Sequence, residues 1–403
     1  KALFDQENKL TGKDELRIYD AASDTSQPIA ADVRGVAGQG EDLSRVYFVS
    51  DEALPGAGAN SPWGEEAVAG QPNLYLWEEG EGEGEAEVSF VATLLESDTG
   101  KLEPGTDQEA YIIGNPGTYS RGTRASADGS ALAFNSRAPL TDFDNTEPAS
   151  GKPAVEVYRY DAQAGELACV SCNPSGARPR GRELREAYTR PAEDHPTKVI
   201  AAAWIRGWEH PLHASRLLSA DGERLFFNAR DALLPRDTNG ADDVYQWEAP
   251  GSGSCSTASP SYFPQSGGCL DLISSGKSPT NSEFMEASPD GADVFFTTEA
   301  GLLPQDPGSV DLYDARVGGG FPQPVPAPQC AGEACQVAPP PPDDPTPASA
   351  SFRGPGDPAP VKARGRRCPK GKRAVRRNGS RRCVKPKVRG NKRRANAKGR
   401  TGR

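Results

Sequence analysis

The chain has 403 residues, 35% of them hydrophobic, and a net charge of −10 at pH 7. It contains no apolar run of about 18 residues, which excludes a membrane-spanning helix. The charge is divided unevenly: the residues after Pro360 include 20 Lys or Arg and no acidic residue, and the preceding part carries 26 basic against 56 acidic side chains. An acidic body with a basic tail bears on solubility and partners rather than on fold.

Short apolar segments alternate with turn residues from Leu16 onward. LRIYDAA (16–22) predicts a strand, and four copies of a longer pattern come after it. The copies are GEDLSRVYFVSDEALPG (40–56) with NLYLWEE (73–79), ASADGSALAFNSRAPLTDFDN (125–145) with VEVYRYD (155–161), LSADGERLFFNARDALLPRDTNGADDVYQWE (218–248) and ASPDGADVFFTTEAGLLPQDPGSVDLYD (287–314). Such a repeat predicts units that pack against one another.

Each copy places an aliphatic and a phenyl side chain two residues apart, on one face of a strand. The pairs are Val46 and Phe48, Leu132 and Phe134, Leu225 and Phe227, and Val294 and Phe296. The residues between them are mostly apolar as well, which predicts strands that are covered on both faces. These are Tyr47, Ala133, Phe226 and Phe295. A second, tyrosine-bearing strand and a third apolar strand follow, and no segment of useful length shows a helical period.

A small antiparallel sheet that is apolar on both faces needs a neighbour on each side. Radial stacking supplies both neighbours, so we expect an all-β chain that forms a β-propeller of four-stranded antiparallel blades, with four to five blades present. A β-sandwich is the alternative, but it does not naturally produce such a repeated column. The aligned residues Asp42, Asp128, Asp221 and Asp290 are 86, 93 and 69 residues apart, against about 40–50 per blade in known propellers. We attribute the excess to inserted loops, chiefly 57–72, 96–124, 173–216 and 252–268.

The stretch SADG-x-x-L-x-F-N followed by LLPRDTNGADDVYQWE resembles the TolB-like, WD-repeat-like propeller repeat of bacterial secreted proteins. The resemblance covers about residues 40–320 and extends to uncharacterised propeller proteins of high-GC actinobacteria. It implies the fold and secretion, or a place in the cell envelope, more than an activity. The chain opens at Lys1, and Met285 is its single methionine. We therefore expect an N-terminally truncated ring, with the leader and first blades upstream.

Composition divides the chain into three parts. Residues 1–320 hold the propeller repeats, residues 321–360 form a proline-rich linker, and residues 361–403 form a basic, largely disordered tail with a disulfide loop. The eight cysteines fall in local pairs, which favours disulfides in an exported chain and leaves their connectivity open. The pairs are Cys169 and Cys172, Cys255 and Cys269, Cys330 and Cys335, and Cys368 and Cys383.

Two other groups of residues offer metal or catalytic chemistry. Cys169 and Cys172 form a CxxC that could serve a zinc or redox site, but no second CxxC or βαβ context accompanies it. His210 and His213 flank Pro211, which breaks helical geometry, so we expect a packed loop there. His195 is the only other histidine. No cofactor is expected from these groups.

The DTNGADD turn offers the oxygen ligands that Ca²⁺ prefers. The candidate ligands are Asp237, Asn239, Asp242 and Asp243. Asx turns explain the same residues without a metal, and a melting temperature that calcium leaves unchanged would exclude the site. The Asp-Gly pairs that begin at Asp128, Asp221 and Asp290 are expected to close tight turns.

The basic tail is the part most suited to a partner, because clustered cations bind polyanions by releasing counterions. The residues assigned to polyanion binding are Arg366, Arg367, Lys370, Lys372, Arg373, Arg376, Arg377, Arg381 and Arg382. Anionic envelope polymers are the expected partners, and nucleic acid is disfavoured because the tail lacks aromatic residues that could stack on bases. A solvated tail, or one folded back on the acidic body, remains the alternative.

Together these features predict a non-catalytic, exported binding scaffold with a basic tail that associates with anionic envelope polymers. The alternative is a propeller hydrolase that acts on glycans or peptides, which would require two convergent carboxylates in one pocket. A third interpretation is an interaction module for another envelope protein, which would present an exposed apolar patch.

Overall fold

A computed structural model describes residues 1–8, 13–54, 65–80, 85–99, 122–184, 199–205, 215–303, 306, 308–322, 368–377 and 379–385. The chain divides into two compact units, residues 1–323 and 324–403, and each is described by itself. Within the described residues the fold is almost entirely β, and its one helix is the single turn α1 (Glu96–Thr99). The prediction of an all-β chain is confirmed.

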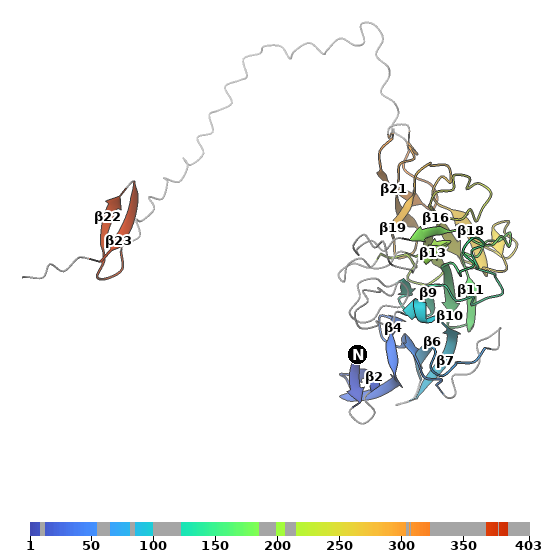
Figure 1. The fold of residues 1–403 in the computed structure, drawn as a ribbon, viewed down its shortest axis with the longest axis horizontal. Coiled ribbons are helices and arrows are strands. Elements are labelled where there is room, and N and C mark those ends of the chain that lie inside the picture. Colours follow the sequence, from blue (N-terminus) through green and yellow to red (C-terminus); the bar gives the residue numbers. More distant parts are fainter. Residues whose placement is uncertain are drawn as a thin grey trace, which may run out of the picture. The chain divides into compact units, whose positions relative to one another are not determined.

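Five antiparallel sheets of three to five strands follow one another along the described part of the first unit, and β12 (Arg182–Leu184) pairs with β13 (Val199–Ala201) in a separate two-stranded sheet (Figure 1). The first contains β1 (Ala2–Asn8), β2 (Lys13–Asp20) and β3 (Thr25–Ala31), and the second β4 (Val33–Gln39), β5 (Arg45–Ser50), β6 (Asn73–Glu79) and β7 (Ala86–Thr93). The third contains β8 (Thr123–Ala125), β9 (Ala131–Ser136), β10 (Glu156–Asp161) and β11 (Glu166–Cys169). The fourth contains β14 (Ala203–Trp204), β15 (Arg224–Ala229), β16 (Asp243–Glu248), β18 (Gly268–Leu272) and β17 (Tyr262–Phe263). The fifth contains β19 (Glu283–Ala287), β20 (Asp293–Thr298) and β21 (Asp311–Arg316).

Three of the segments assigned to inserted loops contain sheet strands, which corrects the sequence analysis. Residues 96–124 include the start of β8, residues 173–216 include β12, β13 and β14, and residues 252–268 include β17. These strands are only two or three residues long, too short to show a period of two. Residues 217–219 continue the edge that β14 forms in the fourth sheet, and Leu218 bridges there to Leu225 of β15.

The alternating apolar columns pack each sheet against the next. Phe48 shares a core cluster with Leu16 and Ile18 of the first sheet, whereas its neighbour Tyr47 faces the cluster that contains Phe134 of the third. The rings of Phe226 and Phe284 stack between the fourth and fifth sheets with centroids 5.8 Å apart. All four matched phenyl side chains are at most 1% exposed. The second, third and fourth sheets are thus covered on both faces as expected, and the second and third have four strands. The expectation fails for the fifth sheet, which has three strands, a partly buried Phe295 and a Leu312 that is 62% exposed. Closure of the sheets into a ring stays a prediction.

The Asp-Gly turns form a ladder of main-chain hydrogen bonds that crosses from sheet to sheet. The N–H of Glu41 donates to Ala127 O at 2.7 Å, Ala127 N–H to Ala220 O at 3.0 Å, and Ala220 N–H to Pro289 O at 2.7 Å. An arginine of the preceding sheet also contacts each of the last three turns: Arg45 donates to Asp128 O, Arg159 to Gly222 O and Arg224 to Asp290 O. This ladder fixes the spacing of the turns that lead into β5, β9, β15 and β20.

The second unit contains an antiparallel hairpin of β22 (Arg373–Arg377) and β23 (Ser380–Val384) (Figure 1). The sequence predicts a basic tail without strands. The described residues nevertheless form two paired strands, because the Cys368–Cys383 bond closes the loop that holds both of them. A disulfide lowers the entropy of the unfolded chain, which favours pairing in a segment with little apolar core.

Candidate functional site

A cavity of about 440 Å³ lies among the edge strands β4 and β8 and residues 216–220, which border the second, third and fourth sheets and are called the inner strands below. Its walls come from equivalent segments of three successive repeats. Each segment lies just before or within the turn whose main chain takes part in the hydrogen-bond ladder. The lining residues fall mainly in 37–41, 123–127 and 216–220. Because equivalent segments of neighbouring repeats converge here, the repeat architecture itself creates the cavity.

Two glycines allow the second sheet to approach the third closely beside the cavity. A Cβ on Gly38 would lie 3.0 Å from the Ala125 Cβ and 3.0 Å from the Leu132 Cδ1, and a Cβ on Gly40 would lie 3.0 Å from the Asp128 carbonyl carbon. Real Cβ atoms are rarely this close to backbone or to a neighbouring Cβ. The small residues therefore set the separation of the cavity walls.

The hydroxyl groups that line the cavity are bonded to the protein. Thr123 Oγ1 donates to Ala37 O. Ser126 Oγ donates to Asp128 and accepts the N–H of Ala131. Ser219 Oγ makes the matching pair of bonds, to Asp221 and from the N–H of Arg224. These bonds belong to the turns and leave the three hydroxyls largely occupied.

Two arginines line the same cavity. Arg216 is anchored: its N–H donates to Glu286 Oε1 at 2.5 Å, and its Nη1 donates to Ala287 O at 3.1 Å. Arg124 is partly buried, and burial lowers the pKa of its guanidinium. The positive charge of Arg216 lowers it further, against the opposite effects of Glu286 and Glu41.

The four residues predicted to bind calcium have several internal partners. Asn239 Nδ2 donates to Asp243 Oδ2 at 2.7 Å, and Asn239 Oδ1 accepts the N–H of Ala241, which is the expected Asx turn. Asp237 accepts the hydroxyl of Tyr245 through Oδ2, and its other oxygen is buried without a hydrogen bond. Burial raises the pKa of Asp237.

Asp242 is directed toward cations of the protein rather than toward the other three candidates. Its Oδ2 lies 2.5 Å from Arg182 Nη1, and its Oδ1 lies 3.5 Å from Arg230 Nη1. Asp242 is fully buried, and burial raises its pKa, which the two arginines oppose. Calcium binding by this turn stays a prediction.

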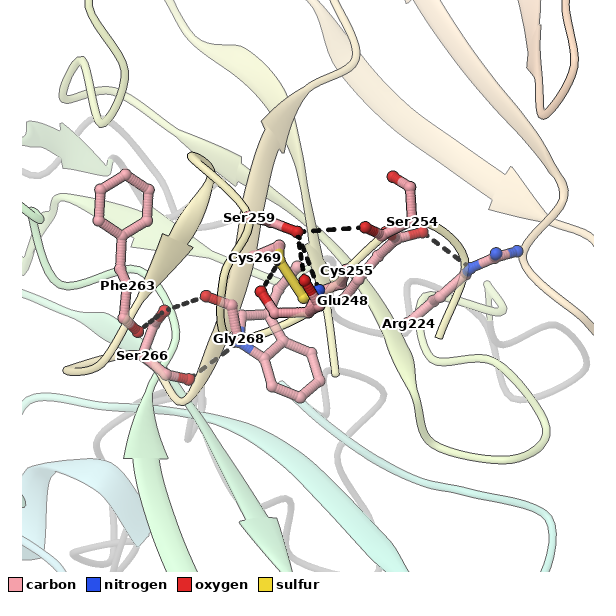
Figure 2. The surroundings of a disulfide bond; sticks show 11 residues. Arg224, Glu248, Ser254, Cys255, Ser259, Phe263, Ser266, Gly268 and Cys269 are labelled. Carbon is pink, nitrogen blue, oxygen red and sulfur yellow. Dashed lines mark hydrogen bonds and ion pairs between the residues drawn. A yellow bond between two sulfur atoms is a disulfide. The ribbon is translucent and has the colours of Figure 1, made fainter. Parts of the chain in front are cut away.

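Three of the four cysteine pairs are disulfides in the structure: Cys169–Cys172, Cys255–Cys269 and Cys368–Cys383. Figure 2 shows the second of these, which ties the insert between β16 and β18 beside the Arg224–Glu248 ion pair. Trp247 Nε1, from β16, donates to Ser266 O of the same insert. Cys330 and Cys335 lie outside the described residues.

The CxxC pair lies against a buried carboxyl group. Cys169, Cys172 and Glu156 present ligand atoms within 4.8 Å of one another, the one such group of three among the described residues. Both sulfur atoms are already joined in the disulfide, and Glu156 Oε2 accepts the hydroxyl of Ser171 at 2.5 Å. These bonds occupy the atoms that a zinc ion would need.

The described part of the basic segment exposes its cations. Lys370, Lys372, Arg373, Arg376 and Arg382 are exposed on or beside the hairpin. Arg377 and Arg381 belong to β22 and β23, but their side chains lie outside the description, as do Arg366 and Arg367 altogether. His195, His210 and His213 also lie outside the described residues.

The fold and the cavity define an all-β repeat protein with a binding-sized space at its inner strands. No family model matches the chain, and no curated protein matches it. Among solved structures it is similar to TolB from Acinetobacter baumannii, with 14% identity over 74% of this chain and 58% of that chain and a TM-score of 0.22. It is also similar to the putative TolB from Agrobacterium tumefaciens, with 11% identity over 80% of this chain and 69% of that chain and a TM-score of 0.28.

A third similar structure is the β-propeller domain of the Trilobed protease from Pyrococcus furiosus, with 9% identity over 78% of this chain and 64% of that chain and a TM-score of 0.32. The chain thus spans less than two thirds of the Acinetobacter and Pyrococcus chains. None of these likenesses bears on activity. Within the described residues, no helix has the length and apolar character needed to cross a bilayer.

Proposed function

We propose that this protein is a non-catalytic, exported binding scaffold whose ligand enters the inner-strand cavity. The cavity volume of about 440 Å³ carries the proposal, because ligand sites typically measure about 300–1,000 Å³. The main-chain ladder supports it, since a site on fixed strands needs little ordering when a ligand binds. Among the described residues that line the cavity, Glu41 is the one carboxylate, whereas glycoside hydrolysis uses two.

Export is supported by the disulfides. Cys169–Cys172 and Cys255–Cys269 both lie in the first unit, and their cysteines are at most 5% exposed. Such bonds form and persist in oxidising compartments outside the cytosol. The proposal therefore places the cavity where extracellular or envelope ligands can reach it.

Replacing Ala220 with tryptophan tests the cavity. Ala220 lines the cavity and contributes only its main chain to the ladder, so the larger side chain should occupy the space without breaking a hydrogen bond. The labelled full-length protein is applied to arrays of peptides and of acidic and neutral oligosaccharides. We expect the A220W variant to lose the ligands that the unchanged protein binds.

Ala164 provides the matched control, because it is exposed in the turn between β10 and β11 and lies outside the cavity lining. The A164W variant should retain every ligand. Equal binding by A220W and the unchanged protein, or binding of no probe by either, would contradict the proposal.

We further propose that residues 361–403 retain the protein on anionic envelope polymers. The exposed Lys370, Lys372 and Arg373 and the 20 cations of this segment support the assignment. Deleting 361–403 should abolish retention on isolated cell walls at low salt, and about 0.5 M salt should release the intact protein, because counterion release makes such binding steeply salt-dependent. If the tail is instead solvated, or folded on the acidic body, the intact protein and the truncated protein should wash off the cell walls alike.

A further inference from the structure

We propose that the inner-strand cavity contains an oxyanion site, in which Arg124 and Arg216 bind a carboxylate or phosphate group of the ligand. The inference rests on the proposed function, since it names the chemistry of the ligand that the cavity receives. It follows from the hydrogen-bond donors of the lining, the electrostatics of Arg124 and the size of the space.

The donors available to a ligand are mostly guanidinium groups. The hydroxyls of Thr123, Ser126 and Ser219 bond to the protein, as described above. The main-chain N–H groups of Ala127 and Ala220 are used in the ladder. Among the described side chains of the lining, this leaves the guanidinium groups and the exposed amide of Gln39 to meet a ligand.

Arg124 is the lining cation that is left open to a ligand. A guanidinium has five N–H donors, and none of those of Arg124 bonds to an acceptor among the described residues. Burial disfavours the charge of Arg124, and the like charge of Arg216 disfavours it further. Glu286 is bonded to the main-chain N–H groups of Arg216 and Ala287, and Glu41 is exposed to solvent.

The chemistry of the missing partner follows from these facts. The guanidinium nitrogens of Arg124 are not among the fully buried atoms that lack a hydrogen bond, so solvent and a ligand can reach them. A bound anion would offset the partial desolvation of Arg124 and the repulsion between the two arginines. The planar guanidinium matches the paired oxygens of carboxylate and phosphate. A neutral ligand would leave the charge of Arg124 uncompensated. The volume suits a small acid, or one acidic group of a longer peptide or polymer.

The test measures thermal unfolding of the full-length protein with succinate or inorganic phosphate as the probe, at constant ionic strength. Succinamide is the matched neutral probe. We expect at least one of the two anions to raise the melting temperature, because a ligand that binds only the folded state stabilises it. Succinamide should have no effect. The two anions distinguish a carboxylate ligand from a phosphate ligand.

The variant R124Q removes the charge and retains much of the length of the side chain. Its affinity for the anion should fall about tenfold or more, and R124K should retain part of it. Without a probe, R124Q should be at least as stable as the unchanged protein, because the substituted group has no protein partner to lose. The control is R178Q, at an exposed arginine paired with Asp144 and outside the cavity lining.

Anions also bind the basic tail, but that contribution is common to all of these variants. An equal response of R124Q and the unchanged protein, an equal effect of succinamide and succinate, or no effect of either anion overturns the oxyanion site. The array experiment distinguishes failure of the oxyanion site from failure of the proposed function. If R124Q keeps an array ligand that A220W loses, the cavity binds a ligand without an oxyanion; if A220W also keeps it, the cavity is not the binding site.

Discussion

Replacing Gly222 with alanine should lower the free energy of unfolding by about 2–4 kcal/mol, from positive φ and overpacking together. Gly222 has φ +73°, and a Cβ there would lie 2.6 Å from the Ala131 Cβ of the neighbouring sheet. Ala131 is fully buried in β9, and its Cβ cannot move without the strand. The loss is measured by urea unfolding.

Gly176 provides a control with the same backbone angle. Its φ is also +73°, but a Cβ at Gly176 meets nothing within 4 Å. The G176A variant should therefore show only the conformational cost, about 1–2 kcal/mol. If both variants lose the same stability, the turn at Gly222 does not press against the third sheet as the structure shows.

Glu156 should make the stability of the protein fall as pH rises. The carboxyl group is 1% exposed at the start of β10. Burial raises its pKa well above the ordinary value, partly opposed by the hydrogen bond from Ser171, and the charge of Asp231 adds a small further rise. Between the unfolded and folded pKa values, the folded state binds one proton more than the unfolded state. Stability should then decrease by about 1.4 kcal/mol per pH unit.

The E156Q variant removes this dependence. The contribution of Glu156 is fully present below its unfolded pKa and is lost as pH rises through the folded pKa. Urea unfolding from pH 5 to pH 8 should therefore give a shallower decline for E156Q than for the unchanged protein. The pKa values of Asp231, Asp237 and Asp242 are also raised. These residues are present in both proteins, so the difference between the two slopes reports on Glu156. E166Q, at an exposed position of β11, controls for the loss of one negative charge. Identical slopes for E156Q and the unchanged protein would contradict the buried, protonated state.

The sheets could be predicted from the sequence because their determinants are local. The side chains of Phe134 and Phe227 recur at a fixed distance after an Asp-Gly pair, and a period of two places each of them on a defined face. Asp128 accepts the N–H of Ser130, and Gly129 has φ +70°, as the turn chemistry predicts. Short-range rules are sufficient for such features.

The cavity could not be predicted in the same way. Arg124 and Arg216 occur four and five residues before the aspartates of their repeats, so they form no column. Both also fall in segments that the repeat spacing assigns to inserted loops. Their proximity depends on how the second, third and fourth sheets pack, and no pattern within one repeat contains that information.

The basic hairpin illustrates a second limit. Val375 and Val384 are among the few apolar residues in β22 and β23, so neither strand has the alternation that identifies strands elsewhere. The Cys368–Cys383 bond compensates for the missing core. The cysteine spacing is visible in the sequence, but it specifies a closed loop rather than paired strands.

Hydrogen bonds between peptide groups do not depend on which side chains the repeats carry. The first copy has lost the Asp-Gly pair, and Leu43 takes a positive φ of 59° where later copies have glycine. Glu41 nevertheless keeps its bond to Ala127 O. Repeats joined in this way can diverge in sequence while their separation is kept, so residues that line the cavity are free to acquire new ligand specificities without a change of framework.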